Sequence, residues 1–570
     1  MTDVHAGAPA GVLGGTAAEA PSDTAADAPH TPLTTTPSDE DYRLGTESFT
    51  DERRTAVLAR LEEHLDQHRA RMLGYQVNLS LDGHTSLGRF LRYHINNVGD
   101  PFVDSHFSMH SRWLERAVLE HYARLWHAPL PEDPTRPRNE DAWGYVLSMG
   151  STEGNLYALW NARDYLDGNA LVRDEISGDA SCRTTYIRAQ HPEDNPNAYA
   201  PVAFFSQETH YSHIKAMRVL DIPTFYDLGG SLYPDQCPID VSGTGTRTYN
   251  GWPLGGVPTT GGDEGPGTVD IDALVPLVEF FAAKGHPVLV NFNVGSVFKG
   301  AYDDVATACE RLRPVFERYG LVDRAVRFDP DDPDRVSVRN GYWVHVDGAL
   351  GGAYAPYLEK ARDAGLTGSA PPVFDFRIPE VSSIVTSGHK YPGAPVPTGI
   401  FLSRAGSKLR PPSDPAVVSS PDSTFAGSRS GFASLAMWNH LAQLGEEEQM
   451  RQAVEALRVA EYTAGRLREL SAALAERGEP WAEDGIEVGH GDHALSVWFQ
   501  QPRAEITAKY TLACVPLDLG GVRHDYSHVY VMPHVTRELV DELVDELYRP
   551  GAFDRSAEEG AVRPPLPGQS

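Results

Sequence analysis

Residues 383–403 read SIVTSGHKYPGAPVPTGIFLS and place one cationic side chain in a short Gly/Pro-rich connection. The segments on both sides, SSIVTSG (382–388) and TGIFLS (398–403), are apolar and rich in β-branched residues, which is typical of buried strands. Lys390 stands between them, after His389 and before a Tyr-Pro-Gly turn. Such a lysine is either a solvated loop residue or a reactive amine held at the end of a strand, and the rest of the sequence decides between these alternatives.

The middle of the chain alternates short apolar segments with helical patterns. This alternation predicts an α/β fold with a mainly parallel sheet, covered by helices and carrying its functional residues at strand ends. A helical pattern begins at Arg53, with one apolar face formed by Val57, Leu58, Leu61 and Leu65. The further predicted strands lie at 142–149, 201–207, 286–295 and 342–350.

Composition indicates a soluble globular protein rather than a nucleic-acid-binding or membrane protein. The formal charge of −30 would repel nucleic acids and anionic membranes. No apolar run approaches the roughly 18–20 residues that span a bilayer, and the N-terminal residues do not resemble a signal peptide, so we expect a cytoplasmic location. The four cysteines, Cys182, Cys237, Cys309 and Cys514, form no C-x-x-C pair and predict neither a zinc site nor a disulfide framework.

The sequence predicts five regions. Residues 1–45 and 550–570 are poor in large apolar residues and are expected to be disordered. Residues 46–115 form an N-terminal helical segment, 116–430 a large α/β domain, and 431–549 a small C-terminal α+β domain. Within the large domain, residues 229–268 and 323–341 are interpreted as surface insertions.

Four features fall at predicted strand ends. GSTEGN (150–155) opens a helix and suits a phosphate, although Ser151 or Thr152 as a simple N-cap explains it equally well. Asp347 in HVDGA ends an apolar strand, where a carboxylate needs a cation or a hydrogen-bond donor; a structural salt bridge is the alternative. His210 follows another strand and is either a packing residue or a ring-stacking group. His210-x-x-His213 has no supporting metal-ligand spacing.

Lys390 is the fourth feature, and it explains the other three. Lysine condenses with carbonyl groups, and pyridoxal phosphate is the commonest such partner. That cofactor needs a Schiff-base lysine, an acid at its pyridine nitrogen, a phosphate cradle and a stacking group. Lys390, Asp347, GSTEG and His210 supply the whole set.

These motifs resemble those of the group II pyridoxal-phosphate-dependent amino-acid decarboxylases. The resemblance rests on SQETHYSHIKAMR (206–218), HVDGALGG (345–352), SGHKYPGAPVPTG (387–399) and GSRSG (427–431), and it extends to INNVGDP (95–101) and FNVGSVFKGAYDD (292–304). It is strongest to the bacterial histidine decarboxylase branch and to the actinomycete valine and methionine decarboxylases. It implies fold type I, with a seven-stranded sheet and an N-terminal segment that clasps the partner subunit of a homodimer.

The resemblance also implies a role for each site residue. Lys390 would bind the cofactor covalently, Asp347 would keep its pyridine nitrogen protonated, and Ala349 and His210 would lie on opposite faces of its ring. Ser296 would lie near the phenolic oxygen. The phosphate would be held by Ser151, Thr152, Ser387, His389 and, from the neighbouring subunit, Ser428.

Two positions depart from the family pattern. Relatives carry a tyrosine in the mobile loop before GSR that assists protonation of the substrate Cα, whereas residues 412–431 contain none and Val417 stands near its expected place. Phe432 stands where the histidine branch tends to have histidine. His210 is then the candidate proton donor; loss of the tyrosine is also associated with aldehyde-forming oxidative decarboxylation.

The segment before INN, MLGYQVNLS (72–80), is expected to line the substrate pocket, with Tyr75 and Gln76 facing the side chain. It offers no acidic residue to pair a cationic substrate, and Phe432 adds apolar character. We therefore predict an aliphatic L-amino acid, methionine or valine, with histidine or an aromatic amino acid as the alternative. The remaining rivals are an aldol-type lyase, a transaminase and a regulatory protein without catalysis.

Overall fold

The structure is a computed structural model and describes residues 42–555, apart from 134–135, 174–183, 243–245, 263–264, 329–335, 409–415, 479–484 and 520–521. Except for 42–45 and 550–555, the two predicted disordered tails lie outside these residues, as does Cys182.

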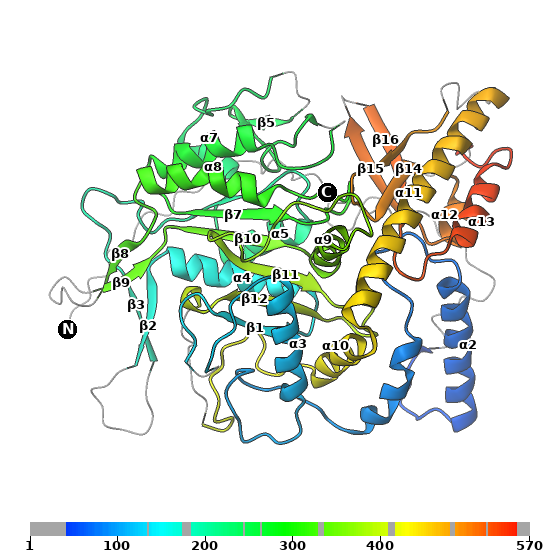
Figure 1. Ribbon diagram of the computed structural model, residues 1–570, viewed down its shortest axis with the longest axis horizontal. Helices are drawn as coiled ribbons and strands as arrows, with labels where there is room; N and C mark the ends of the chain where they lie inside the picture. Colours follow the sequence, from blue (N-terminus) through cyan, green and yellow to red (C-terminus); the bar gives the residue numbers. More distant parts are fainter. Residues whose placement is uncertain are drawn as a thin grey trace.

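A six-stranded sheet with strand order β1-β12-β11-β10-β7-β4 forms the centre of the large domain (Figure 1). Five strands run in one direction and β12 runs opposite to them. Every strand predicted in this part of the chain is confirmed. They are β1 (Ala142–Leu147), β4 (Val202–Phe204), β7 (Val288–Asn293), β10 (Tyr342–Asp347), β11 (Val381–Ser387) and β12 (Gly399–Arg404).

The sheet has one strand fewer among the described residues than the seven that the family resemblance implied. At the free edge of β4, the seventh strand is reduced to a single parallel bridge between Ala203 and Thr224. Ala203 N donates to Pro223 O at 3.0 Å. Pro223 has no N–H with which to extend the ladder, and Thr224 caps the helix that starts at Phe225, so the chain leaves the sheet there.

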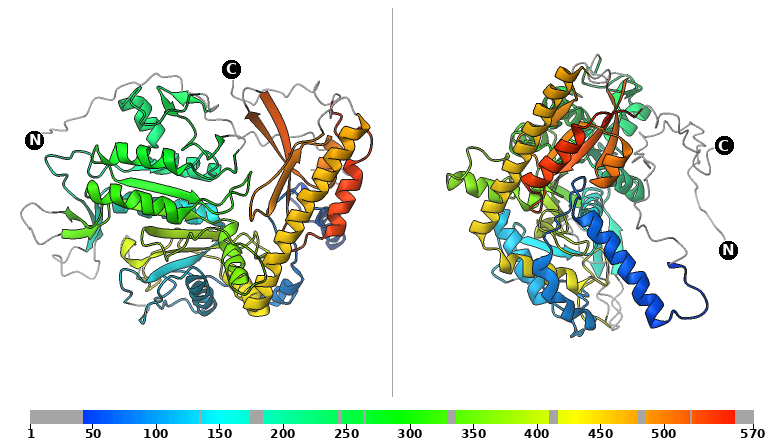
Figure 2. Two further views of the ribbon diagram at one scale, coloured as in Figure 1. Left: turned by 45° about the horizontal axis from the view of Figure 1, so that its top comes forward. Right: turned by 90° about the vertical axis from the view of Figure 1, so that its right-hand side faces the viewer.

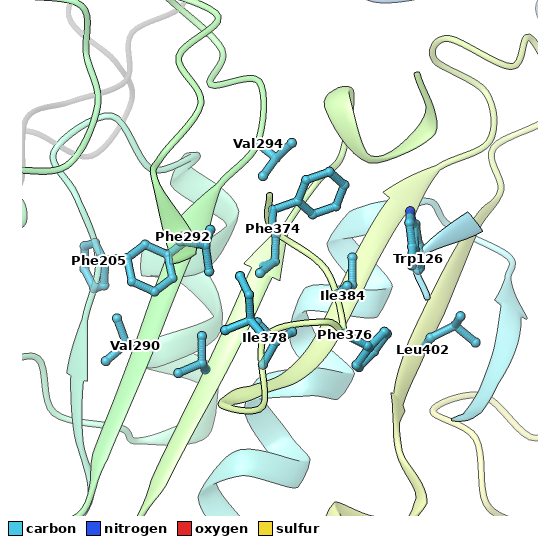
Figure 3. Close-up of a cluster of buried hydrophobic side chains, with 14 of the residues drawn as sticks. Trp126, Phe205, Val290, Phe292, Val294, Phe374, Phe376, Ile378, Ile384 and Leu402 are labelled. Carbon is cyan, nitrogen blue, oxygen red and sulfur yellow. The ribbon is translucent and has the colours of Figure 1, made fainter. Parts of the chain in front are cut away.

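The two faces of the sheet differ in chemistry. One face packs against α3 (Arg112–Leu125), α7 (Ile271–Ala282) and α8 (Val305–Arg318) through large apolar side chains. Figure 3 shows part of this core, including Val290, Phe292, Ile384 and Leu402. The opposite face packs against α4 (Ser151–Leu166), with α5 (Tyr211–Leu220) beside it, and its strand residues alternate with the apolar set. Near β1 and β12 this face holds an apolar cluster around Tyr145, Val385 and Phe401. We call it the polar face because of its other buried residues: Asn291, Asn293, His345, Asp347, Ser383, Ser387 and Ser403.

A second sheet, with order β13-β14-β16-β15, forms the small C-terminal unit at the right of Figure 1. The long helix α11 (Glu446–Arg477) packs against this sheet. The unit has an apolar core of its own around Leu467, Phe499 and Leu543, separate from the core of the large domain. The unit's remaining elements are β13 (Val488–His490), β14 (Ser496–Gln500), α12 (Ala504–Lys509), β15 (Ala513–Leu519), β16 (Val522–Tyr530) and α13 (Arg537–Leu547). By contrast α10 (Gly431–Gln443), which the sequence placed with this unit, packs against α3 and η1 (Asp82–Arg92).

The N-terminal helix α2 (Asp51–Arg69) lies along the outside of the molecule (Figure 2). Its predicted apolar face is only partly covered within one chain. Val57 is buried, whereas Leu58 and Leu65 are each 56% exposed. The predicted clasp on a partner subunit stays a prediction, and the exposed leucines are the surface it would use.

The two predicted insertions form hairpins. Residues 323–341 contain β8 (Arg324–Arg327) and β9 (Val336–Arg339), and residues 229–268 contain β5 (Thr248–Tyr249) and β6 (Trp252–Pro253). The second insertion also contributes to the core, because Trp252 and Val257 are fully buried. The other elements of the large domain are β2 (Asn169–Arg173), β3 (Thr184–Arg188), α6 (Phe225–Leu232), η4 (Gly351–Ala353), α9 (Ala355–Asp363) and η5 (Ala405–Ser407).

Candidate active site

The polar face of the sheet ends in a cluster of functional side chains. Asp347 is the last residue of β10, and Ser387 is the last residue of β11. Lys390 follows three residues after β11, while His210 caps the N-terminus of α5. Because the carboxyl ends of parallel strands meet at one edge of a sheet, residues far apart in sequence converge here.

Asp347 is buried and accepts three hydrogen bonds. Asn155 Nδ2 donates to Oδ2 at 2.8 Å, His213 Nε2 lies 3.1 Å from the same oxygen, and Ala349 N donates to Oδ1 at 3.0 Å. Burial alone would raise the pKa of Asp347, but the His213 hydrogen bond and the neighbouring imidazoles hold that pKa below its usual value. Asp347 is therefore a buried carboxylate at neutral pH, suited to a protonated ring nitrogen.

Three residues of this cluster were missed from the sequence: Asn155, His213 and His345. Asn155 lies one helical turn after Ser151 on α4, so the i, i+4 spacing of helical neighbours was the signal. His213 was noticed only as the second histidine of a metal-like pair. In the structure it lies on α5 and contacts Asp347, and no metal-binding group of three or more acidic, histidine or cysteine side chains occurs in the described part of the chain.

Lys390 is mostly buried, and within the described residues its amine has no hydrogen-bond partner. Burial lowers the pKa of Lys390, and the charge of Asp347 partly opposes this effect. A lysine with a lowered pKa has a larger fraction of neutral, nucleophilic amine. The backbone around it is firmly held, because Asn78 donates from N to Lys390 O at 3.1 Å and from Nδ2 to Tyr391 O at 2.9 Å.

The first turn of α4 meets the end of β11 through two hydroxyl groups. Ser151 Oγ lies 2.7 Å from Ser387 Oγ, and Ser151 N donates to Ser387 Oγ at 3.2 Å. Gly150 precedes them with a φ of +75°, and a Cβ at this position would come within 2.5 Å of the His389 ring. Glycine therefore leaves the helix N-terminus open beside Ser387 and His389. Thr152 is exposed at the same turn.

His210 is both a helix cap and a site residue. Its Nδ1 accepts from Ser212 N at 3.3 Å and lies 2.7 Å from Ser212 Oγ. Because Nδ1 accepts a backbone N–H, the neutral ring carries its proton on Nε2. Burial lowers the pKa of His210 to about 4, so the ring is neutral at pH 7.

Among the described residues, no hydrogen bond joins the remaining predicted residues to this cluster. Ser296 is buried after β7, and its Oγ accepts from Ala301 N at 3.0 Å. Gln76 is buried, and its Nε2 has no hydrogen-bond partner among the described residues. Tyr75 is half-exposed, and Phe432 in the first turn of α10 is partly buried.

Ser428 and Val417 are exposed on a single chain. Asn96 Nδ2 donates to Ser428 Oγ at 3.1 Å, while Val417 is 88% exposed. The adjacent Arg429 is almost fully buried and forms an ion pair with Glu115. The INN and GSR motifs are thus joined behind an outward-facing Ser428. Residues 412–415, at the start of the 412–431 loop, lie outside the described residues.

The residues present fit pyridoxal phosphate. A phosphate matches the N-terminus of α4, where Ser151 meets Ser387 of β11, because hydroxyl donors and the helix dipole favour an anion there. The Lys390 amine, which has no hydrogen-bond partner among the described residues, matches the aldehyde, and the buried carboxylate of Asp347 matches the pyridine nitrogen. No helix within the described ranges has the length and apolarity to cross a membrane.

Comparisons with known proteins agree with this cofactor. The structure is similar to that of L-methionine decarboxylase from Streptomyces sp. 590, with a TM-score of 0.82 and 41% identity over 91% of this chain and 100% of that chain. Curated relatives include histidine decarboxylase of Solanum lycopersicum, 26% identical over 86% of this chain and 87% of its own length. Serine decarboxylase 1 of Oryza sativa subsp. japonica is 26% identical over 90% of this chain and 78% of its own. No protein-family model matches the chain.

The predicted fold class, cofactor and reaction class are confirmed by these relatives and by the mainly parallel α/β sheet. A chain 41% identical to an amino-acid decarboxylase along that protein's whole length shares its family. The chain belongs to the group II pyridoxal-phosphate-dependent amino-acid decarboxylases and is a carboxy-lyase of fold type I.

Proposed function

We propose that this enzyme decarboxylates L-methionine to its primary amine, with L-valine as a second aliphatic substrate. The observation that carries this proposal is the 41% identity to an L-methionine decarboxylase over 91% of the chain. The apolar Phe432 supports it. Histidine decarboxylases among the curated relatives keep histidine as the alternative substrate.

We propose a role for each site residue, supported by its place at the strand ends and at the start of α4. The cofactor supplies an electron sink for the charge that remains at Cα when CO2 leaves. Lys390 would hold the cofactor, Asp347 would keep its ring nitrogen protonated, and Ala349, beside Asp347, would pack under the ring. Ser151, Thr152, Ser387 and His389 would bind the phosphate. Ser296 would lie near the phenolic oxygen.

His210 is proposed to cover the opposite face and to deliver the proton to Cα, in place of the absent loop tyrosine. Its capping bonds to Ser212 fix the tautomer that presents Nε2–H. As Nε2–H passes to Cα, Nδ1 takes the hydroxyl proton of Ser212, 2.7 Å away, and solvent replaces that proton. Because the pKa of His210 is lowered to about 4, the ring is neutral between pH 5 and 8. The rate of Cα protonation should therefore show no pH step near 6.5.

The variant His210→Asn separates the two roles of this residue. Asparagine caps helices well, so α5 and the thermal midpoint should be retained. Amine formation should fall by roughly 10²- to 10⁴-fold, the usual contribution of a positioned proton donor. Steady-state kinetics and exchange of solvent deuterium into the amine provide the measurement. Wild-type rates of amine release in His210→Asn would contradict the assignment.

Gln76 is the proposed contact for the substrate side chain, with Tyr75 and Phe432 beside it. A buried N–H without a partner costs free energy until a ligand supplies an acceptor. The thioether sulfur of methionine is such an acceptor, although a weak one, and the side chain of valine has none. Gln76 thus favours methionine among aliphatic substrates of similar size.

An amino-acid panel tests both the product and the substrate. Methionine, valine, histidine, phenylalanine and norleucine, which matches methionine without the sulfur, are supplied singly, and CO2, amine, aldehyde and peroxide are measured. Methionine should exceed norleucine in kcat/KM by between about 2- and 13-fold, as a neutral hydrogen bond of about 0.5–1.5 kcal/mol allows, and Gln76→Leu should remove that preference. Dominant aldehyde and peroxide would establish the oxidative alternative, and a histidine preference would overturn the substrate.

The proposal includes a homodimer with active sites at the subunit interface. The exposed Leu58 and Leu65 of α2 and the outward-facing Ser428 support it, since an apolar helix face needs a partner surface. Sedimentation equilibrium should give about twice the chain mass of 62.3 kDa. A monomer that retains full activity would exclude the role of Ser428 in a neighbouring site.

A further inference from the structure

A continuous chain of hydrogen bonds lies behind Asp347, on the side remote from the strand ends. Trp343 Nε1 donates to Ser383 Oγ at 3.0 Å, and Ser383 Oγ lies 2.8 Å from His345 Nδ1. His345 Nε2 lies 2.9 Å from Asn155 Oδ1, and Asn155 Nδ2 donates to Asp347 Oδ2 at 2.8 Å. All five side chains are buried. We name this set the Trp343–Asp347 chain.

The chemistry of its two ends fixes the direction of every bond between them. An indole N–H can only donate, and an ionised carboxylate can only accept. Ser383 Oγ accepts from Trp343 and gives its own hydrogen to His345 Nδ1. The proton of the neutral His345 ring is then on Nε2 and faces Asn155 Oδ1. This leaves the Asn155 amide with its N–H groups toward Asp347.

His345 is neutral, as this arrangement requires, because burial lowers its pKa to about 3. The proton that it shares with Asn155 therefore stays on Nε2 at neutral pH. This proton determines the orientation of the Asn155 side-chain amide. Without a donor at Oδ1, the amide is free to rotate, and its carbonyl would then oppose the carboxylate of Asp347.

The fold aligns the chain with the site. Trp343, His345 and Asp347 alternate along β10 and so share the polar face, and Ser383 is the register partner of His345 on β11. On α4, Asn155 lies one turn after Ser151, which contacts Ser387. One helix thus connects both ends of the cofactor site: its first turn borders the phosphate cradle, and its second turn holds Asp347.

We propose that His345 is a positioning residue that acts through Asn155: it fixes the amide orientation that keeps Asp347 ionised and aligned with the cofactor's ring nitrogen. This inference rests on the proposed role of Asp347. His345 itself contacts neither the carboxylate nor the reacting atoms. The closest precedent in physical terms is the outer shell of a metal site, where a distant hydrogen bond fixes the ligand that does the chemistry.

Four variants of the holoenzyme test it: His345→Phe, Asn155→Leu, their double variant and Asp347→Asn. In His345→Phe we expect kcat to fall about 10- to 100-fold, as for outer-shell residues at metal sites. KM should stay within about twofold, because substrate binding is untouched. The double variant should be no slower than Asn155→Leu alone, since two residues that act through one bond are not additive.

A spectroscopic readout distinguishes positioning from a structural role. The pH midpoint of the cofactor's yellow absorbance reports the proton on the lysine-bound nitrogen, and a protonated ring nitrogen lowers that midpoint by repulsion. His345→Phe should raise it by about one pH unit, toward the value of Asp347→Asn. Loss of packing alone would lower the thermal unfolding midpoint or the fraction of enzyme that binds the cofactor. It would leave the pH midpoint of the absorbance of the bound cofactor unchanged.

The outcomes separate this inference from the proposed function. An unchanged absorbance midpoint in His345→Phe, or additive losses in the double variant, would overturn the role of His345. If Asp347→Asn kept wild-type kcat, the role of Asp347 itself would fail and this inference with it. Should His345→Phe not fold, Ser383→Ala must raise the midpoint in the same direction by a smaller amount, because it frees His345 Nδ1; no shift there would also overturn the proposal.

Discussion

Replacing Lys390 with alanine is expected to abolish both decarboxylation and the yellow absorbance of the bound cofactor. Lys390 carries the amine at the end of β11 that has no hydrogen-bond partner within the described residues, and burial lowers its pKa. Without Lys390 the cofactor loses its covalent attachment to the protein. The substrate amine then has no bound lysine to displace from the cofactor. Absorbance spectra of purified protein and CO2 release with methionine check both effects.

The matched control is Lys215→Ala. Lys215 is an exposed lysine on α5, five residues from His210, and its ammonium lies 6.0 Å from the centre of the Tyr211 ring. This variant should keep the absorbance and the turnover of the wild type. Yellow absorbance in Lys390→Ala at the wild-type level would refute the cofactor attachment at this position.

The largest expected effect on stability comes from the buried ion pair between Glu115 and Arg429. Both side chains are at most 1% exposed. Glu115 also accepts from Val146 N at 3.0 Å and from Asn97 Nδ2 at 2.9 Å, so one carboxylate joins α3, β1 and the INN motif. Glu115→Leu should reduce the free energy of unfolding by roughly 3–5 kcal/mol, because it leaves a buried guanidinium without its counter-charge. Scanning calorimetry at a fixed scan rate measures the change.

Two controls identify the cause. The double variant Glu115→Leu with Arg429→Met removes both charges and should recover part of the loss, as replacements of whole buried pairs do. Arg451→Ala breaks an exposed pair with Glu448 on α11 and should cost at most about 1 kcal/mol. A Glu115→Leu enzyme as stable as Arg451→Ala would show that the buried pair does not hold these motifs together.

This ion pair has a functional consequence through its neighbour. Arg429 N donates to Asn96 Oδ1 at 3.0 Å, and Asn96 Nδ2 donates to Ser428 Oγ at 3.1 Å. A rigid base behind Ser428 gives an exposed hydroxyl a fixed position. Such a position is what a residue needs if it is to reach the phosphate of a neighbouring subunit, the role proposed for Ser428.

The elements of the central sheet were predictable because each strand is buried on both faces. Segments such as VLVNFN at β7 and SIVTS in β11 are short, apolar and bounded by Gly, Pro or Asn, and this local pattern is visible without tertiary contacts. The seventh strand was not predictable in this way. Pro223 and the cap at Thr224 end it after one bridge, which is a consequence of turn chemistry rather than hydrophobicity.

Helix α2 was predicted correctly, but the packing of its apolar face was not. Val57, Leu58, Leu61 and Leu65 share one side by periodicity, yet only Val57 is buried. Periodicity reports that a face is apolar and not what covers it. Within one chain, Leu58 and Leu65 remain on the surface.

The sequence by itself determined the cofactor and the reaction class, because Lys390, Asp347, His210 and the GSTEG turn are chemically unusual at strand ends and occur in a specific order. The tertiary structure alone decided how Asp347 is held. Its side-chain partners Asn155 and His213 come from α4 and α5, and His345 on β10 contacts Asn155 in turn. Hydrogen bonds between such distant segments leave no local pattern in the chain. Residue types indicate which reaction a site can carry out. The ionisation of a buried carboxylate depends instead on which donors the fold brings within about 3 Å of it.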